Sequence, residues 1–113
     1  MKLRTIQNIY DSLNRENFGG RLERPTIRLT RHKDNHAHYQ FGGNTSRTLM
    51  EFNPADTRGL QEMRATVFHE MVHQFVYEIL DTVEKDDHGD VFWLTYFTFA
   101  NPTFAWEKPD DHA

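Results

Sequence analysis

Any fold of this chain has to accommodate one unusual helix, centred on VFHEMVHQFVYEIL at residues 67–80. Apolar residues recur there at helical spacing and predict a buried face made of Phe68, Met71, Val72, Phe75 and Ile79. The side chains of His69, Glu70 and His73 project beside that face. The pattern predicts a half-buried helix that still leaves room for two imidazoles and a carboxylate.

The two histidines of this helix have the spacing of metal ligands. His69 and His73 stand at positions i and i+4, so their Cβ atoms lie about 6 Å apart on one helix face. Glu70 is turned by about 100° from His69, so it reaches a metal-bound water more easily than the metal itself. This is the HExxH pattern, in which two histidines bind zinc and the glutamate is the general base. The alternative is a pair of exposed or capped histidines on the flank of a helix.

A catalytic zinc site needs a third protein ligand, and the chain has no cysteine to supply it. Metzincin spacing would require glycine at position 76 and histidine at position 79; Val76 and Ile79 stand there instead, which excludes that class. His88 lies fifteen residues after His73. The helix rises about 10 Å up to Leu80, and the following loop can return up to about 26 Å, so His88 can reach the histidine pair.

The residue after His88 is Gly89, which would allow a close approach of the loop to the helix. Four acidic residues are rivals for the third position, because carboxylates also bind zinc: Glu84, Asp86, Asp87 and Asp90. We favour the histidine. The sequence therefore predicts one zinc ion per chain, bound by His69, His73 and His88.

The rest of the chain predicts a single α+β domain over residues 1–113. In order, the patterns indicate a helix over 3–18, strands within 25–31, 36–41 and 47–52, a long helix from 57–60 to about Leu80, a last helix over 90–100 and an irregular tail. The β-branched and aromatic residues of 90–100 leave a strand as the alternative there. Gly19 and Gly20 should end the first helix. Asp56 or Thr57 is expected to cap the long one.

Charge is distributed unevenly along the chain. Residues 1–50 hold nine basic and four acidic residues, whereas residues 51–113 hold four and thirteen. The basic residues concentrate between positions 21 and 33: Arg21, Arg24, Arg28, Arg31 and Lys33. This stripe predicts the solvated face of a strand, with at most weak binding of nucleic acid. His36 and His38 share a strand face, which could be a minor metal site, a substrate contact or a solvated edge, and His32 and His112 are expected at the surface.

The chain lacks the features of a membrane or exported protein. No apolar run approaches the roughly 18–20 residues of a membrane span, and the start, MKLRTIQNIYDSLN, lacks the apolar core of a signal peptide. With no cysteine to form disulfides, a cytoplasmic location is expected.

Most of the chain resembles the SprT-like metalloprotease domain. The resemblance is carried by four pieces of sequence: YDSLNRENFGGRL, MEFNP, VFHEMVHQF and DHGDVFW. It implies a small zincin-like (minigluzincin-like) fold, with zinc on His69, His73 and the histidine of the HGxxF motif, His88, and with Glu70 as base. Many members of that family carry a C-terminal zinc ribbon, which this chain cannot form without cysteine. The compact form would suit a bacterial or phage-encoded protein.

These observations together predict a zinc-dependent metalloprotease that hydrolyses peptide bonds of a protein or peptide substrate. Glu70 would activate a zinc-bound water, and an exposed strand edge near the site would bind the substrate as an added strand. Oxyanion stabilisation would come from Tyr39, Tyr77 or Tyr96, among which the sequence does not choose. The alternative function is a non-catalytic, zinc-stabilised binding module, in one version associated with nucleic acid.

Overall fold

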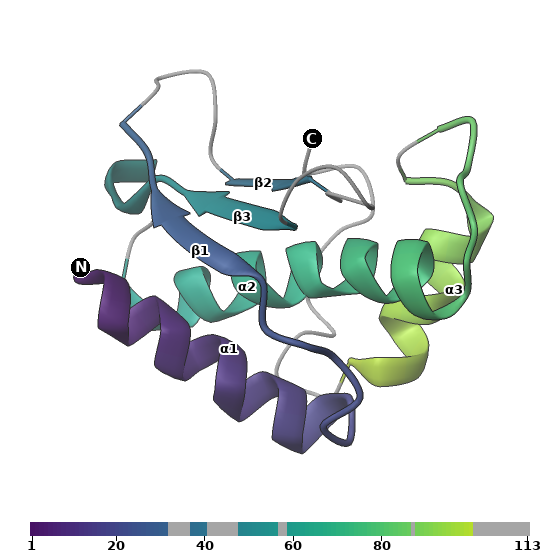
Figure 1. Ribbon diagram of the computed structural model, residues 1–113, viewed down its shortest axis with the longest axis horizontal. Helices are drawn as coiled ribbons and strands as arrows, with labels where there is room; N and C mark the ends of the chain where they lie inside the picture. Colours follow the sequence, from purple (N-terminus) through teal and green to yellow (C-terminus); the bar gives the residue numbers. More distant parts are fainter. Residues whose placement is uncertain (32–36, 41–47, 57–58, 87, 101–113) are drawn as a thin grey trace.

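The computed structural model describes residues 1–31, 37–40, 48–56, 59–86 and 88–100, and these residues form an α+β fold (Figure 1). A long central helix lies below a three-stranded sheet, with the N-terminal helix α1 along it and the last helix α3 at its C-terminal end. The expected tail after residue 100 lies outside the described residues. No helix of the described part is both long and apolar enough to cross a bilayer.

Helix α1, Leu3–Asn17, turns its apolar face to the core, as predicted. The two glycines after it adopt positive φ angles, 64° at Gly19 and 73° at Gly20. In that conformation the backbone reverses, and the N–H of Gly20 donates to the carbonyl of Asn14 at 2.8 Å. A residue with a Cβ would be strained at both positions, so the glycines end this helix for the expected reason.

The sheet consists of β1 (Thr26–Leu29), β2 (Ala37–Gln40) and β3 (Leu49–Phe52), in the order β1-β3-β2. β1 runs parallel to β3 and β2 antiparallel to it. Met50 and Phe52 are buried, whereas Leu49 and Glu51 are partly exposed. The predicted alternation on β3 is therefore confirmed, and it places the buried face of the sheet against the helices.

The central helix begins at Leu60, and its N-cap is Gly59 with a φ of 100°. The prediction of Asp56 as the cap is wrong: Asp56 ends a short 3-10 helix, η1 (Pro54–Asp56), three positions before Gly59. Thr57 lies outside the described residues. Gly59 has no side chain that could cap this end, and its positive φ is a conformation that glycine adopts without strain.

The central helix changes its pitch near its end. It is α-helical over Leu60–Gln74 (α2) and π-helical over Phe75–Ile79 (η2). The N–H of Leu80 accordingly donates to the carbonyl of Phe75 at 3.0 Å, five residues back. The wider turn rotates the last residues relative to an α-helical extrapolation. Ile79, which was predicted on the buried face, is therefore 47% exposed.

α2 is buried on most of its surface and not only along one stripe, which corrects the prediction of a half-buried helix. The sheet, α1 and α3 all contact it. Ten of its fifteen residues are buried: Met63, Ala65, Thr66, Val67, Phe68, His69, Glu70, Met71, Val72 and Gln74. The histidine and the carboxylate of the motif therefore lie inside the protein.

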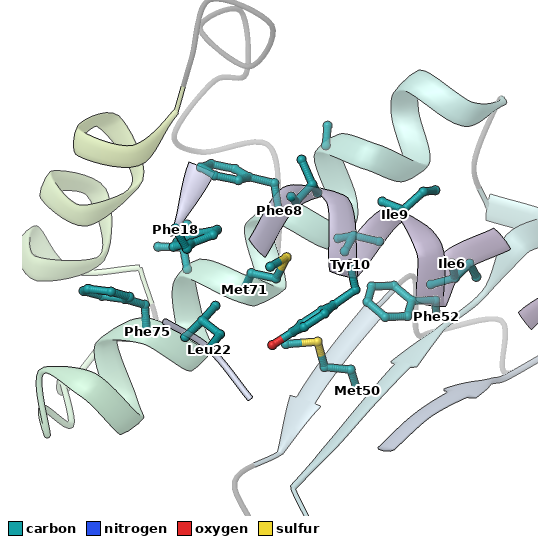
Figure 2. Close-up of a cluster of buried hydrophobic side chains, with 14 of the residues drawn as sticks. Ile6, Ile9, Tyr10, Phe18, Leu22, Met50, Phe52, Phe68, Met71 and Phe75 are labelled. Carbon is teal, nitrogen blue, oxygen red and sulfur yellow. The ribbon is translucent and has the colours of Figure 1, made fainter. Parts of the chain in front are cut away.

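Aromatic and methionine side chains fill the core between these elements (Figure 2). Phe18, at the end of α1, packs against Phe68 and Phe75 with ring centroids 5.5 and 6.0 Å away. Met50 and Phe52 of the sheet are fully buried in the same cluster. These contacts join α1, the sheet and the central helix into one apolar core.

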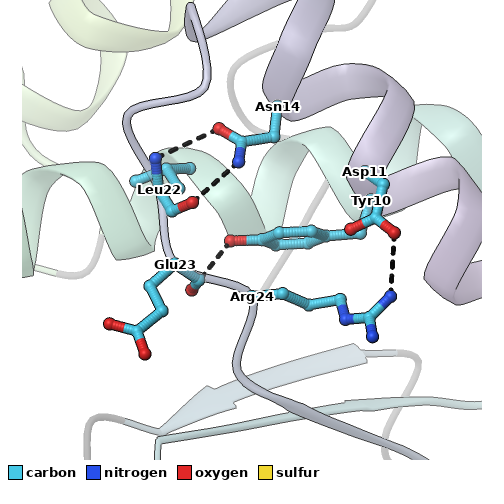
Figure 3. Close-up of polar contacts among 6 residues, drawn as sticks. All are labelled: Tyr10, Asp11, Asn14, Leu22, Glu23 and Arg24. Atoms are coloured by element: carbon cyan, nitrogen blue, oxygen red, sulfur yellow. Dashed lines mark hydrogen bonds and ion pairs between the residues drawn. The ribbon is translucent and has the colours of Figure 1, made fainter.

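A polar network runs through this core beside α2. The hydroxyl of Tyr10 donates to Gln74 Oε1 at 2.6 Å and lies 3.2 Å from the carbonyl of Glu23, a contact shown in Figure 3. The amide of Gln74 also donates to the Glu23 carbonyl, at 2.8 Å. Burial raises the pKa of Tyr10 well above its usual value, so the hydroxyl remains a donor. The network ties α1 and the segment before β1 to the residue that follows His73.

Candidate metal centre

Two elements bring three histidines together. His69 and His73 lie one turn apart on α2, and His88 lies in the segment that leads into α3 (Asp90–Phe99). The Nε2 atom of His88 is 3.0 Å from Nε2 of His69 and 3.2 Å from Nε2 of His73. One ligand nitrogen from each residue lies within 4.8 Å of the others, and this group could hold a metal ion.

The spacing of these nitrogens fits zinc. Two nitrogens bound to a tetrahedral zinc at 2.0–2.1 Å are separated by about 3.3 Å, close to the 3.0 and 3.2 Å found for His88. A neutral ring nitrogen either donates or accepts one hydrogen bond, so His88 Nε2 cannot serve both neighbours well. A single cation at the centre would satisfy all three lone pairs.

The surroundings keep the His73 imidazole neutral. His69 is only 3% exposed, so the interpretation of two exposed histidines is wrong for this residue. Desolvation lowers the pKa of His73 to about 3, with further contributions from the nearby His69 and His88. A neutral imidazole keeps the lone pair that a metal requires, so His73 is ready to bind a metal at neutral pH.

One aromatic side chain touches all three histidines. The ring centroid of Phe92, on the first turn of α3, is 4.9 Å from that of His69, 4.4 Å from that of His73 and 4.8 Å from that of His88. Trp93 lies next to it, 6.0 Å from His88. The sequence pattern alone assigns no role to either residue. Phe92 is the last residue of the HGxxF motif, which was the only available signal.

Glu70, the predicted base, is 5% exposed and follows His69 on α2. Among the described residues, the group that could hold a metal consists of the three histidines without a carboxylate. Glu70 therefore lies next to the predicted ligands in the chain without being one of them, as its position one residue after His69 predicts.

The acidic rivals of His88 have other environments. The carboxylate of Glu84 accepts hydrogen bonds from the backbone N–H groups of Val91 and Phe92 at 3.1 and 2.8 Å. Asp86 and Asp90 are exposed, and Asp87 lies outside the described residues. In the described part of the chain, then, the third nitrogen beside the α2 pair comes from His88.

Gly89 lies against the carboxylate of Glu84. A Cβ at this position would overlap the carboxylate of Glu84, whose Cδ would be 2.8 Å away. The glycine thus leaves room for Glu84, and its expected role in the approach to the central helix stays a prediction. Its φ of −79° is open to any residue, so space and not backbone conformation explains the glycine.

The three tyrosines considered for oxyanion stabilisation differ in environment. Tyr39 on β2 donates from its hydroxyl to Glu78 Oε2 at 2.7 Å, and burial together with this bond raises its pKa strongly. Tyr96 is fully buried and packs edge-on against Phe68 at 5.0 Å. Tyr77 is 38% exposed. These environments do not distinguish which of the three tyrosines would stabilise an oxyanion.

The basic stripe is partly neutralised within the chain. Arg24 pairs with Asp11 at 2.8 Å (Figure 3), and Arg28 pairs with Glu51 at 3.1 Å. Arg21 stacks over Phe99, 5.7 Å from its ring centre. These partners leave the stripe with less free positive charge than the sequence suggests.

Several residues singled out from the sequence lie apart from the three histidines or outside the described part. His38 is exposed on β2. Lys33, His32, His36 and His112 lie outside the described residues.

Comparison with protein-family models, with curated proteins and with solved structures gives no match to this chain. The function is therefore argued from the residues and their geometry.

Proposed function

We propose that this protein is a zinc-dependent metallopeptidase with the zincin-like architecture of SprT-like domains. The observation that carries the proposal is the convergence of the His69, His73 and His88 nitrogens beside the helix that also holds Glu70. Three protein ligands are the number found in catalytic zinc sites. His69, His73 and His88 would hold the zinc, which would supply the Lewis acidity that activates water and polarises the scissile carbonyl.

The residues of the chain have separate roles in this reaction. Glu70 takes the proton of the attacking water and passes it to the leaving amine, so the carboxylate ends the cycle as it began. Glu70 is only 5% exposed, and charges interact more strongly in the lower dielectric of the protein interior than in water. Phe92 packs on all three imidazoles and excludes water from that side of the site.

The substrate is a protein or peptide bound in an extended form. β2 is an outer strand of the described sheet, since it pairs only with β3 there. It contacts α2, the helix that holds His69 and His73. An extended peptide can add to such an edge through its main chain, which explains binding without a sequence-specific pocket.

A second candidate function is a binding module in which zinc is structural. The close packing of Phe92 on the three histidines favours it, because a structural site is closed to solvent. A structural site, however, has no use for a carboxylate at position 70. The two functions therefore differ in what Glu70 does.

The test replaces Glu70 by glutamine, which keeps its size and removes the basic carboxylate. Zinc content should stay the same, and cleavage of an unfolded substrate such as casein should fall by at least about 10²–10⁴-fold, the contribution of a positioned acid or base. Glu62→Gln, the same change on the first turn of α2, is the matched control and should keep activity. Wild-type protein that binds zinc and cleaves nothing in a broad panel of unfolded proteins would favour the binding module.

A further inference from the structure

The carboxylate of Glu84 closes the loop that carries His88. Its two oxygens accept hydrogen bonds from Val91 N–H at 3.1 Å and Phe92 N–H at 2.8 Å, in the first turn of α3. The N-cap residue of α3, Gly89, offers no side-chain cap of its own. Glu84 therefore caps this helix from five residues upstream of Gly89.

These two bonds are of a strong type. The first N–H groups of a helix have no partner inside it, and the partial positive charge at that end favours an anion. Hydrogen bonds from N–H groups to a carboxylate are shorter and stronger than neutral ones. The side chain of Glu84 thus joins the start of the segment 84–92 to its end through hydrogen bonds. His88 lies at the middle of this segment, four residues from each end.

The glycine at position 89 leaves the space that the Glu84 carboxylate occupies in this contact. Its φ and ψ, −79° and −168°, are available to other residues. A Cβ there would collide with the Glu84 carboxylate. Because Gly89 has no side chain, the Glu84 carboxylate can lie against the start of α3.

The same bonds fix the wall of the metal centre. The residue whose N–H donates to Glu84 Oε1 is Phe92. Its ring contacts the imidazoles of all three histidines, with centroids between 4.4 and 4.9 Å away. Releasing the first turn of α3 would free this ring and the His88 loop together.

We propose that Glu84 is a positioning residue for the metal centre: it holds His88 and Phe92 in place against the α2 histidines without touching the metal. The inference rests on the proposed metal site. Its physical basis is preorganisation, because a ligand held in its bound position loses little conformational freedom when the metal arrives. Groups behind the ligands of metal sites commonly contribute about 10–100-fold in affinity.

The experiment measures zinc affinity by competition with a chelator, at a temperature where every variant is folded. Glu84→Ala should bind zinc at least about tenfold more weakly than wild type. Glu84→Gln, which keeps one acceptor oxygen and loses the charge, should lie between the two. The absorption spectrum of bound Co²⁺, which reports ligand geometry, should also change in Glu84→Ala.

Asn14→Ala is the matched control. Asn14 also braces a loop with two backbone bonds, to the N–H of Leu22 at 3.1 Å and to its carbonyl at 2.7 Å (Figure 3). Its loss should lower stability by a similar amount, about 1–3 kcal/mol, and leave zinc affinity and the Co²⁺ spectrum unchanged. An equal loss of affinity in Asn14→Ala and Glu84→Ala would overturn the inference.

A double-mutant cycle with Gly89→Ala isolates the contact. Gly89→Ala should weaken zinc binding in the wild-type background and have little further effect when combined with Glu84→Ala, because the carboxylate it displaces is already gone. Additive effects would contradict the inference. Wild-type protein that binds no zinc would refute the metal site itself; zinc binding equal in wild type, Glu84→Gln and Glu84→Ala would refute only the role of Glu84.

Discussion

Removing the hydroxyl of Tyr10 tests whether the buried network beside the metal helix stabilises the fold. In Tyr10→Phe, Gln74 Oε1 loses the donor that lies 2.6 Å away, in a residue that is 0% exposed. Water cannot easily replace that donor, so the change should cost about 1–3 kcal/mol of unfolding free energy. For a domain of this size this lowers the melting temperature by several degrees, at about 4 °C or more per kcal/mol.

The assay is urea unfolding in the presence of a chelator, so that metal binding does not contribute to stability. Tyr39→Phe is a useful comparison, because its partner, Glu78 at 2.7 Å, is only part-buried and can turn to water. It should cost less than Tyr10→Phe. In the background Gln74→Met, which removes the buried acceptor, Tyr10→Phe should lose much of its effect. A cost below about 0.5 kcal/mol for Tyr10→Phe in the wild-type background would refute the argument, since it would mean that the buried oxygen needs no donor.

Two further predictions concern the histidines. His88→Ala should lower zinc affinity far more than Asp86→Ala, measured by chelator competition, because His88 supplies the third nitrogen and Asp86 is exposed; equal losses would move the ligand assignment to the carboxylate. The metal-free protein should become less stable as the pH falls from about 6.5 toward 3, because His73 takes up its proton in the unfolded chain before the folded one, whose pKa is about 3. Urea unfolding over that range would show the slope, and His73→Gln should reduce it.

The sequence pattern predicted the order of the α-helices and strands, although not the short 3-10 helix η1 or the π-helical segment η2. The helical spacing of Ile6, Ile9 and Leu13 and the alternation around Met50 correspond to what the structure shows, because both periods are local properties of the chain. The distance available to the loop also predicted that His88 could return to the α2 pair, and the two lie together in the structure.

Features that depend on distant partners could not be predicted. The burial of His69 follows from α3 packing over it, and no local period encodes that contact. The π-helical turn that exposes Ile79 and the cap of α3 by Glu84 likewise involve neighbours several residues away. For Gly89 the sequence suggested a close approach of the loop to the central helix, and the structure shows the carboxylate of Glu84 in the space that a Cβ would fill.

The zinc content of the purified protein tests the metal centre most directly. Protein stripped with a chelator, incubated with excess zinc and freed of unbound metal should retain one zinc per chain by elemental analysis, as expected for three nitrogen ligands around a single open position. The His69→Ala, His88→Ala double variant, treated in the same way, should retain essentially none. Wild-type protein that remains free of zinc after this treatment would contradict the account.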